Sequence, residues 1–127
     1  MMSPQEAGQV RAVRGATTVD EDLSAQVNER TSELVREVLA RNHIAPEDLV
    51  SIVFTATPDL VSDFPAVAAR GIGLSDVPLL CCQEIPVKGA IERCVRVLIH
   101  FYTPLARAEI RHVYLHGARQ LRLDLPE

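Results

Sequence analysis

The first third of the chain contains two different patterns of apolar residues: one with the spacing of a strand and one with the spacing of a helix. Residues 10–16 alternate apolar or small side chains with charged ones, which is the period of a strand with one dry and one polar face. From Leu23 to Leu39 the apolar positions recur at helical spacing and predict one buried stripe of about six turns. Thr18 and Glu21 stand at the spacing of a capping box, so we expect this helix to begin there and to end at Asn42-His43.

The middle of the chain predicts two buried strands with a short helix between them. Residues 49–56 form a β-branched apolar run, which is typical of a strand covered on both faces. Residues 63–70 predict a short helix with Asp63 near its cap and Pro65 in its first turn. Residues 77–85 predict the next strand, which ends unusually on a carboxylate, Glu84.

The last third predicts a second long helix and a closing strand or strand pair. The apolar positions between Ile91 and Tyr102 fit a helix stopped by Thr103-Pro104. Residues 111–115 and 120–123 predict strands interrupted at Gly117. The result is an α+β fold in which two long helices cover one face of a mixed sheet. Since the other face also needs a cover, we expect a homo-oligomer.

Length and charge restrict the classes of function that this fold could serve. The 127 residues suit one domain, which we place at residues 10–127 after a flexible leader at 1–9. A net charge of -4 argues against nucleic-acid binding. No apolar run approaches the roughly 20 residues of a membrane span, and no signal pattern is present. We therefore expect a cytoplasmic protein with no membrane partner, whose three cysteines are reduced thiols.

Arginine dominates the basic residues, and several arginines fall on predicted strands or mid-helix. The chain has 12 Arg against one Lys. A planar guanidinium binds carboxylates through two hydrogen bonds and stays charged, so this bias suits a small anionic ligand. A codon bias would produce the same excess, so composition alone leaves both explanations open.

A resemblance to a known family covers residues 10–125. The chain is similar to the trimeric, pseudo-α/β-barrel class of chorismate mutases, a ferredoxin-like fold named after the Bacillus enzyme. The similar segments occur in the same order as in that family: residues 10–19, 55–60, 64–66, 77–78, Cys81, 83–84, 94–97 and 110–115. Each segment is weak alone, whereas the combination is specific.

The resemblance implies an activity, an assembly and the absence of a cofactor. Such enzymes convert chorismate to prephenate by an intramolecular [3,3] rearrangement, in the biosynthesis of phenylalanine and tyrosine. They need no cofactor and no metal, and they form homotrimers with active sites at subunit interfaces. Catalysis then comes from holding the substrate in its reactive conformation and from fixed positive charge near the breaking C–O bond.

The resemblance also implies roles for five catalytic residues. Arg96 would donate to the ether oxygen, Arg14 and Tyr114 would bind a carboxylate, and Glu84 would accept a hydrogen bond from the ring hydroxyl near Cys81. From the residues alone, each has an ordinary alternative. Arg96 would be a solvated helix arginine, Arg14 an edge-strand charge, Tyr114 a core aromatic and Glu84 a surface acid.

A second set of residues corresponds to the walls and entrance of the family's substrate cavity. The wall positions are Phe64, Ala66, Leu79 and Leu80, and the entrance positions are Arg70, Leu121 and Arg122. Two residues depart from the family: Val67 stands where the family has lysine, and Leu80 stands where it has threonine. Those two polar contributions to substrate binding are therefore missing from this chain.

Other functions remain possible from the sequence. A metal site is disfavoured because the cysteines and histidines lack ligand spacing, and a cysteine nucleophile on a buried strand would be inert. A non-catalytic trimeric module that binds a small carboxylate is the main alternative. An imine deaminase of the similar trimeric barrel type is a further enzymatic one.

Overall fold

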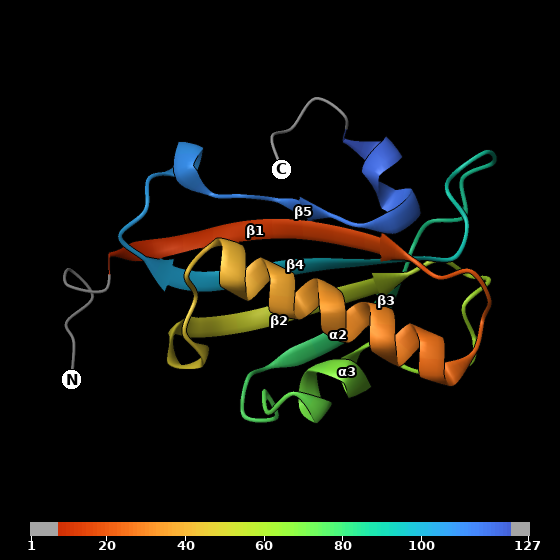
Figure 1. Cartoon of the computed structure of the whole chain (residues 1–127), viewed down its shortest axis with the longest axis horizontal. Coiled ribbons are helices and arrows are strands. Elements are labelled where there is room, and N and C mark those ends of the chain that lie inside the picture. The colour runs from red at the N-terminus through yellow and green to blue at the C-terminus, as the bar shows by residue number, and fades with distance from the viewer. Residues whose placement is uncertain (1–7, 123–127) are drawn as a thin grey trace.

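The computed structural model describes residues 8–122, which form a five-stranded mixed sheet with helices on one face (Figure 1). The strands are β1 (Gln9–Thr18), β2 (Leu49–Ala56), β3 (Leu79–Gln83), β4 (Cys94–Thr103) and β5 (Val113–Tyr114). Their order across the sheet is β3-β2-β4-β1-β5. The central strand β4 runs antiparallel to β2 and β1, whereas the edge strands β3 and β5 run parallel to their neighbours. The predicted α+β class with a mixed sheet is confirmed.

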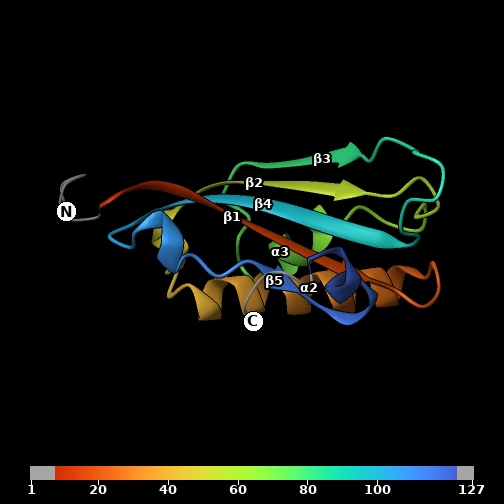
Figure 2. The same cartoon turned by 90° about the horizontal axis from the view of Figure 1, so that it is seen from above.

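Both α-helices cover the same face of the sheet and leave the opposite face open. Helix α2 (Ser24–Arg41) and helix α3 (Ala66–Gly71) lie together beneath the strands when the sheet is seen from above (Figure 2). Three short 3-10 helices, η1 (Pro46–Asp48), η2 (Arg107–Glu109) and η3 (His116–Leu121), complete the described chain. The core therefore forms between α2, α3 and one sheet face.

Side-chain alternation along the strands decides which residues enter this core. Val13 on β1, Phe54 on β2 and Ile99 on β4 are fully buried and point toward the helices. The buried residues of α2 form the middle of the predicted stripe: Val27, Thr31, Leu34, Val35 and Val38. Leu23 precedes the helix and is exposed, and Leu39 is only partly buried. Because successive strand residues point to opposite faces, the residues between them project from the open face.

The predicted start of the first helix is wrong by several residues. Thr18 is the last residue of β1, and its hydroxyl accepts the backbone N–H of Gly117 at 2.9 Å instead of capping a helix. Helix α2 begins at Ser24, after Leu23, with no side-chain cap. The turn before the helix is held instead by Gln26, whose side-chain oxygen accepts the backbone N–H groups of Asp20 and Glu21.

The second long helix predicted between Ile91 and Tyr102 does not exist, and strand β4 takes its place. In β4 the buried residues alternate, with Val95, Val97, Ile99 and Phe101 facing the helices. An apolar run this dense satisfies the helical and the strand spacing at once. Pairing on both sides, with β1 and β2, decides in favour of the strand because it satisfies the backbone groups of a buried segment.

The remaining elements match their predictions in part. Strand β2 has the predicted bounds, and α2 ends where Asn42 was expected to end it. The predicted final strand at 120–123 is wrong for residues 120–121, which belong to η3, and residue 123 lies outside the described residues. Gln9 already belongs to β1, while residues 1–7 of the predicted leader are likewise outside the described part. No helix within residues 8–122 is both long and apolar enough to span a membrane.

Candidate functional site

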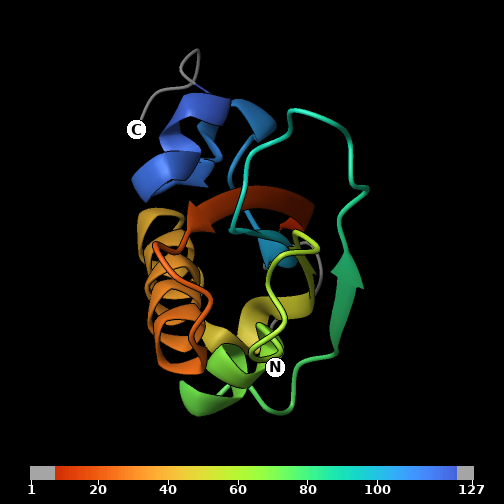
Figure 3. The same ribbon diagram turned by 90° about the vertical axis from the view of Figure 1, so that its right-hand side faces the viewer.

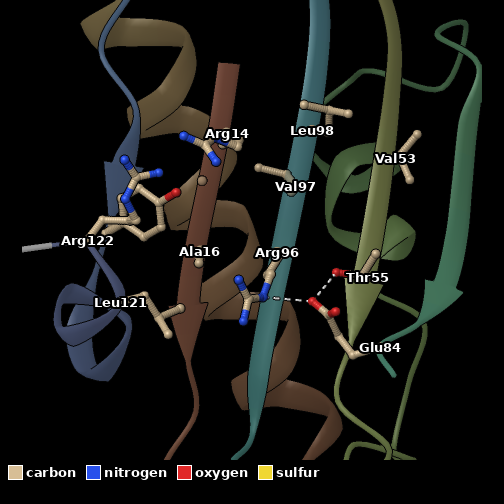
Figure 4. A pocket seen from close by; sticks show the side chains of 12 residues that line it. Arg14, Ala16, Val53, Thr55, Glu84, Arg96, Val97, Leu98, Leu121 and Arg122 are labelled. Carbon is tan, nitrogen blue, oxygen red and sulfur yellow. Dashed lines mark hydrogen bonds and ion pairs between the residues drawn. The ribbon is translucent and has the colours of Figure 1, made fainter. Parts of the chain in front are cut away.

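The open face of the sheet carries a cavity of about 400 Å³ across its central strands (Figure 4). Residues that pair across neighbouring strands line it side by side. Ala16 on β1 pairs with Arg96 on β4, which pairs with Thr55 on β2. One row away, Arg14 pairs with Leu98, and Leu98 pairs with Val53. Each of these positions is two residues from the next along its strand, so all six side chains emerge on the same face.

The cavity is positively charged with an apolar floor. Its lining consists of Arg14, Gly15, Ala16, Val53, Thr55, Glu84, Arg96, Val97, Leu98, Tyr114, Leu121 and Arg122. Three arginines face a single acidic residue, so the cavity is suited to an anionic ligand with apolar parts. Its volume lies in the range of pockets that enclose small organic molecules.

Arg96 and Glu84 form an ion pair at one end of the cavity. The Nε atom of Arg96 lies 2.8 Å from Oε1 of Glu84, and the Thr55 hydroxyl donates to the same oxygen at 2.7 Å (Figure 4). The Arg96 Nε–H is buried and makes no well-aligned hydrogen bond within residues 8–122, so the ion pair with Glu84 is its main contact there.

Arg14 and Arg122 lie together at the other end of the cavity (Figure 4). Tyr114 reaches this region from the edge strand, since β5 pairs with β1 at Ala16. Leu121 is the last residue of η3, which packs beside β1, and Arg122 comes directly after it. The structure thus brings together six of the predicted site residues: Arg14, Glu84, Arg96, Tyr114, Leu121 and Arg122.

The other predicted site residues do not reach this cavity within one chain. Phe64 and Cys81 line a separate hollow of about 300 Å³, formed by residues 56–65 and the end of β3. Figure 3 shows β3 at the edge of the sheet away from β5 and η3. The side chain of Cys81 also packs against the helix-side core. Cys81 therefore does not contact Arg96 or Glu84 in the single chain.

The wall and entrance positions spread over three surroundings. Ala66 is buried in the core and Leu79 packs against that core, so neither lines the cavity on the open face. Leu80 is 59% exposed on the open face of β3. Val67 and Arg70 lie on α3, with Arg70 exposed. These positions, with Phe64 and Cys81, make up a second group on the β3 side of the molecule.

A pair of aspartates holds the loop that presents Phe64. The Asp22 carboxylate accepts the backbone N–H groups of Val61 and Ser62, and the Ser24 hydroxyl donates to Asp63 at 2.7 Å. Hydrogen bonds from the Ser62 side chain and the Val61 backbone hold the pKa of Asp22 below its usual value. The Phe64 ring is nevertheless 69% exposed, so the loop is anchored while the ring is left uncovered.

The cysteines and histidines form no metal centre among the described residues, where no group of three or more potential ligands occurs. Burial raises the pKa of the Cys94 thiol to about 11, so this thiol stays protonated at neutral pH. Its hydrogen-bonding surroundings are structural, since the Cys94 backbone N–H donates to Thr57 at 2.9 Å.

Sequence reasoning missed Thr55 and the apolar floor. The signal for Thr55 was its place near the end of a strand whose other residues, apart from Ser51, are apolar. That partner, Glu84, follows the neighbouring strand, and only the parallel pairing of β2 with β3 brings the two together. Val53 and Leu98 are ordinary strand residues whose role as a floor depends on sheet register.

Comparison with known proteins points to one family. The family described as chorismate mutase type I matches residues 10–125. Chorismate mutase AroH of Bacillus subtilis is 41% identical over 117 residues, covering 91% of this chain and 92% of the relative. Chorismate mutase AroH of Thermus thermophilus is 46% identical over the same length, covering 91% and 96%. A solved chorismate mutase from Clostridium thermocellum superposes with a TM-score of 0.86 at 41% identity, covering 87% of this chain and 98% of that one.

Proposed function

This chain belongs to the chorismate mutase type I family and converts chorismate to prephenate, and we propose that the cavity on its open sheet face is the reaction site. The reaction is intramolecular. As the ether C–O bond breaks, a C–C bond forms elsewhere in the same molecule, and nothing is transferred to the protein. The protein therefore contributes shape and fixed charge.

Arg96 is the residue we assign to the ether oxygen. This oxygen gains negative charge as the C–O bond breaks, so a donor fixed beside it stabilises the transition state more than the substrate. The ion pair with Glu84 holds the guanidinium at one end of the cavity, which Arg96 lines. This guanidinium, fixed by a carboxylate inside a cavity with an apolar floor, is the observation that carries the proposal.

Arg14, Tyr114 and Glu84 orient the substrate around that contact. Arg14 and the Tyr114 hydroxyl bind a carboxylate at the end of the cavity that Arg122 also lines. Thr55 and Arg96 both contact Oε1 of Glu84, and no contact engages Oε2 among the described residues. Oε2 is thus placed to accept the hydrogen bond of the substrate's ring hydroxyl. Arg14 and Tyr114 thus anchor the substrate by its carboxylate, while Glu84 and Arg96 hold its reacting part in one conformation.

The complete site needs a second subunit, and we assign the assembly as a homotrimer. The cavity and the second group of site residues lie toward different edges of the sheet, so they would complete each other only between neighbouring copies. Two different surfaces in contact make a head-to-tail interface, which closes into a ring. Exposed apolar side chains, Phe64, Leu80 and Tyr102 among them, support burial of these surfaces. The threefold count comes from the resemblance to the trimeric class.

The activity is tested by mixing purified protein with chorismate and following both its absorbance and the appearance of prephenate. We expect stoichiometric conversion without any added cofactor. Binding of chorismate without turnover would indicate the alternative, a non-catalytic carboxylate-binding module. Loss of chorismate without prephenate, or turnover of an imine instead, would contradict the mutase assignment.

Arg96→Ala tests the electrostatic role. We expect kcat to fall by at least about 10²–10³, because a fixed donor to a developing oxyanion contributes this much. Arg36→Ala is the matched control, since Arg36 is an exposed arginine on α2 outside the cavity. Both variants should keep the wild-type sedimentation mass. Near-normal kcat in Arg96→Ala would remove Arg96 from the reaction.

A further inference from the structure

His112 immediately precedes strand β5 and contacts the backbone of Arg14 on β1. In the parallel pairing of β5 with β1, Gly15 is opposite Val113, which places His112 opposite Arg14. Here the imidazole ring replaces a backbone partner: the Arg14 backbone N–H donates to Nδ1 of His112 at 3.0 Å. The N–H that fixes the strand at Arg14 is therefore satisfied by a titratable side chain.

The position of His112 is fixed from the helix side. Asn42, the buried residue that ends α2, accepts the backbone N–H of Arg111 at 2.7 Å and donates to the Arg111 carbonyl at 2.9 Å. Its amide also donates to Val38 within the helix. A continuous set of hydrogen bonds thus runs from α2 through Arg111 and His112 to the backbone of Arg14.

We propose that neutral His112 is a positioning residue for Arg14, holding the strand so that the guanidinium faces the substrate carboxylate. The proposal rests on the carboxylate-binding role that we assign to Arg14. To accept the Arg14 N–H, Nδ1 must carry a lone pair, so the ring must be the tautomer with its proton on Nε2. A protonated ring has two N–H groups, and one of them would then oppose the Arg14 N–H.

Arginines surround His112, and the charges of Arg14 and Arg122 favour its neutral ring. Arg11 on β1 and Arg107 on η2 line the same hollow as His112. Burial, followed by the charges of Arg14 and Arg122, holds the pKa of His112 below its usual value. The lowered pKa means that His112 stays neutral as the pH falls to 6.5, the ordinary histidine value, and becomes protonated only in more acidic solution.

Acidification should therefore weaken substrate capture before it affects the chemical step. A carboxylate contact made equally in the substrate and the transition state sets KM and leaves kcat unchanged. Arg14 makes such a contact in our assignment, whereas Arg96 acts on the reacting bond. Misplacing Arg14 should raise KM selectively, and a purely structural defect would not produce this split.

The experiment compares His112→Ala and His112→Asn with wild type between pH 5.0 and 7.5. Asn carries an acceptor oxygen near the place of Nδ1 and does not titrate. At pH 7.5 we expect KM to rise about fivefold in His112→Ala, the effect of one lost hydrogen bond, with kcat nearly unchanged. His112→Asn should restore KM and keep it constant as the pH falls, while the wild-type KM rises toward that of the Ala variant as His112 becomes protonated.

His43→Asn is the matched control, because His43 is an exposed histidine at a positive φ of 53°, which Asn tolerates. It should keep the wild-type pH profile. An unchanged KM in His112→Ala, or an acid rise in KM that persists in His112→Asn, would overturn the positioning role. Arg14→Ala separates the two proposals. If it also leaves KM unchanged, the assigned role of Arg14 fails; if only the His112 variants are silent, the positioning role alone fails.

Discussion

At the residue scale, the cavity depends on a few polar contacts that cross between strands. Glu84 follows β3, Thr55 lies on β2 and Arg96 on β4, so three strands meet at one carboxylate oxygen. A carboxylate held by a hydroxyl and a guanidinium has little freedom to turn. Its orientation should therefore matter for the substrate hydroxyl that we assign to it.

Thr55→Val tests this orientation at nearly constant shape. The valine cannot donate to Glu84, and a hydrogen bond to a charged group typically contributes enough for a tenfold effect or more. We expect kcat/KM for chorismate to fall about tenfold. Thr55→Ser keeps the hydroxyl and should stay close to wild type. Equal activity of the valine and serine variants would show that Thr55 does not orient Glu84.

At the element scale, strand β1 passes very close to helix α2 while Arg14 and Ala16 point to the open face. Gly15 makes this possible. A Cβ atom there would lie 3.1 Å from Leu34, 3.2 Å from Val38 and 3.1 Å from the Val113 carbonyl oxygen. These distances are too short for comfortable contact, so any side chain at this position pushes the strand away from the helix.

Gly15→Ala should therefore lower the free energy of unfolding by about 1–3 kcal/mol, the usual cost of overpacking a core. Urea unfolding of the two proteins under the same conditions measures it. Gly71→Ala is the matched control, since a Cβ there meets nothing within 4 Å, and it should leave the stability nearly unchanged. If the two variants have equal stability, the close approach of β1 to α2 does not limit packing.

At the scale of the whole molecule, the predicted site residues fall into two separate groups. One group surrounds the cavity, and the other lies around Phe64, Leu80 and α3. Neither group alone encloses a substrate. In the proposed trimer, each site would take its cavity from one subunit and its remaining wall from the next.

Mixing two defective variants tests this shared site. Arg96→Ala impairs the cavity, whereas Arg70→Glu impairs the second group and should lower kcat/KM by reversing an entrance charge. After random reassembly, about one quarter of the interfaces would join an intact cavity to an intact second group. We expect activity well above the sum of the separate variants, and a sedimentation mass of three chains. A mixture no more active than that sum would contradict sites shared between subunits.

The sequence determined part of this protein by local spacing. Alternation at residues 10–16, the helical stripe of α2 and the β-branched run of β2 each predicted an element that the structure contains. The first two patterns each fit one periodicity, and the run at residues 49–56 is short and rich in β-branched residues, which favours a strand. The ordered family segments also identified half of the twelve cavity residues: Arg14, Glu84, Arg96, Tyr114, Leu121 and Arg122.

Only the tertiary structure decided the rest. Residues 94–103 are dense enough in apolar side chains to fit a helix or a strand, and pairing with β1 and β2 selects the strand. That pairing turns Arg96 from a presumed helix residue into one that projects from the open face beside Glu84. Likewise, the parallel register of β5 places His112 against Arg14 across 98 positions of sequence. Contacts of this kind depend on strand register, which local periodicity does not contain.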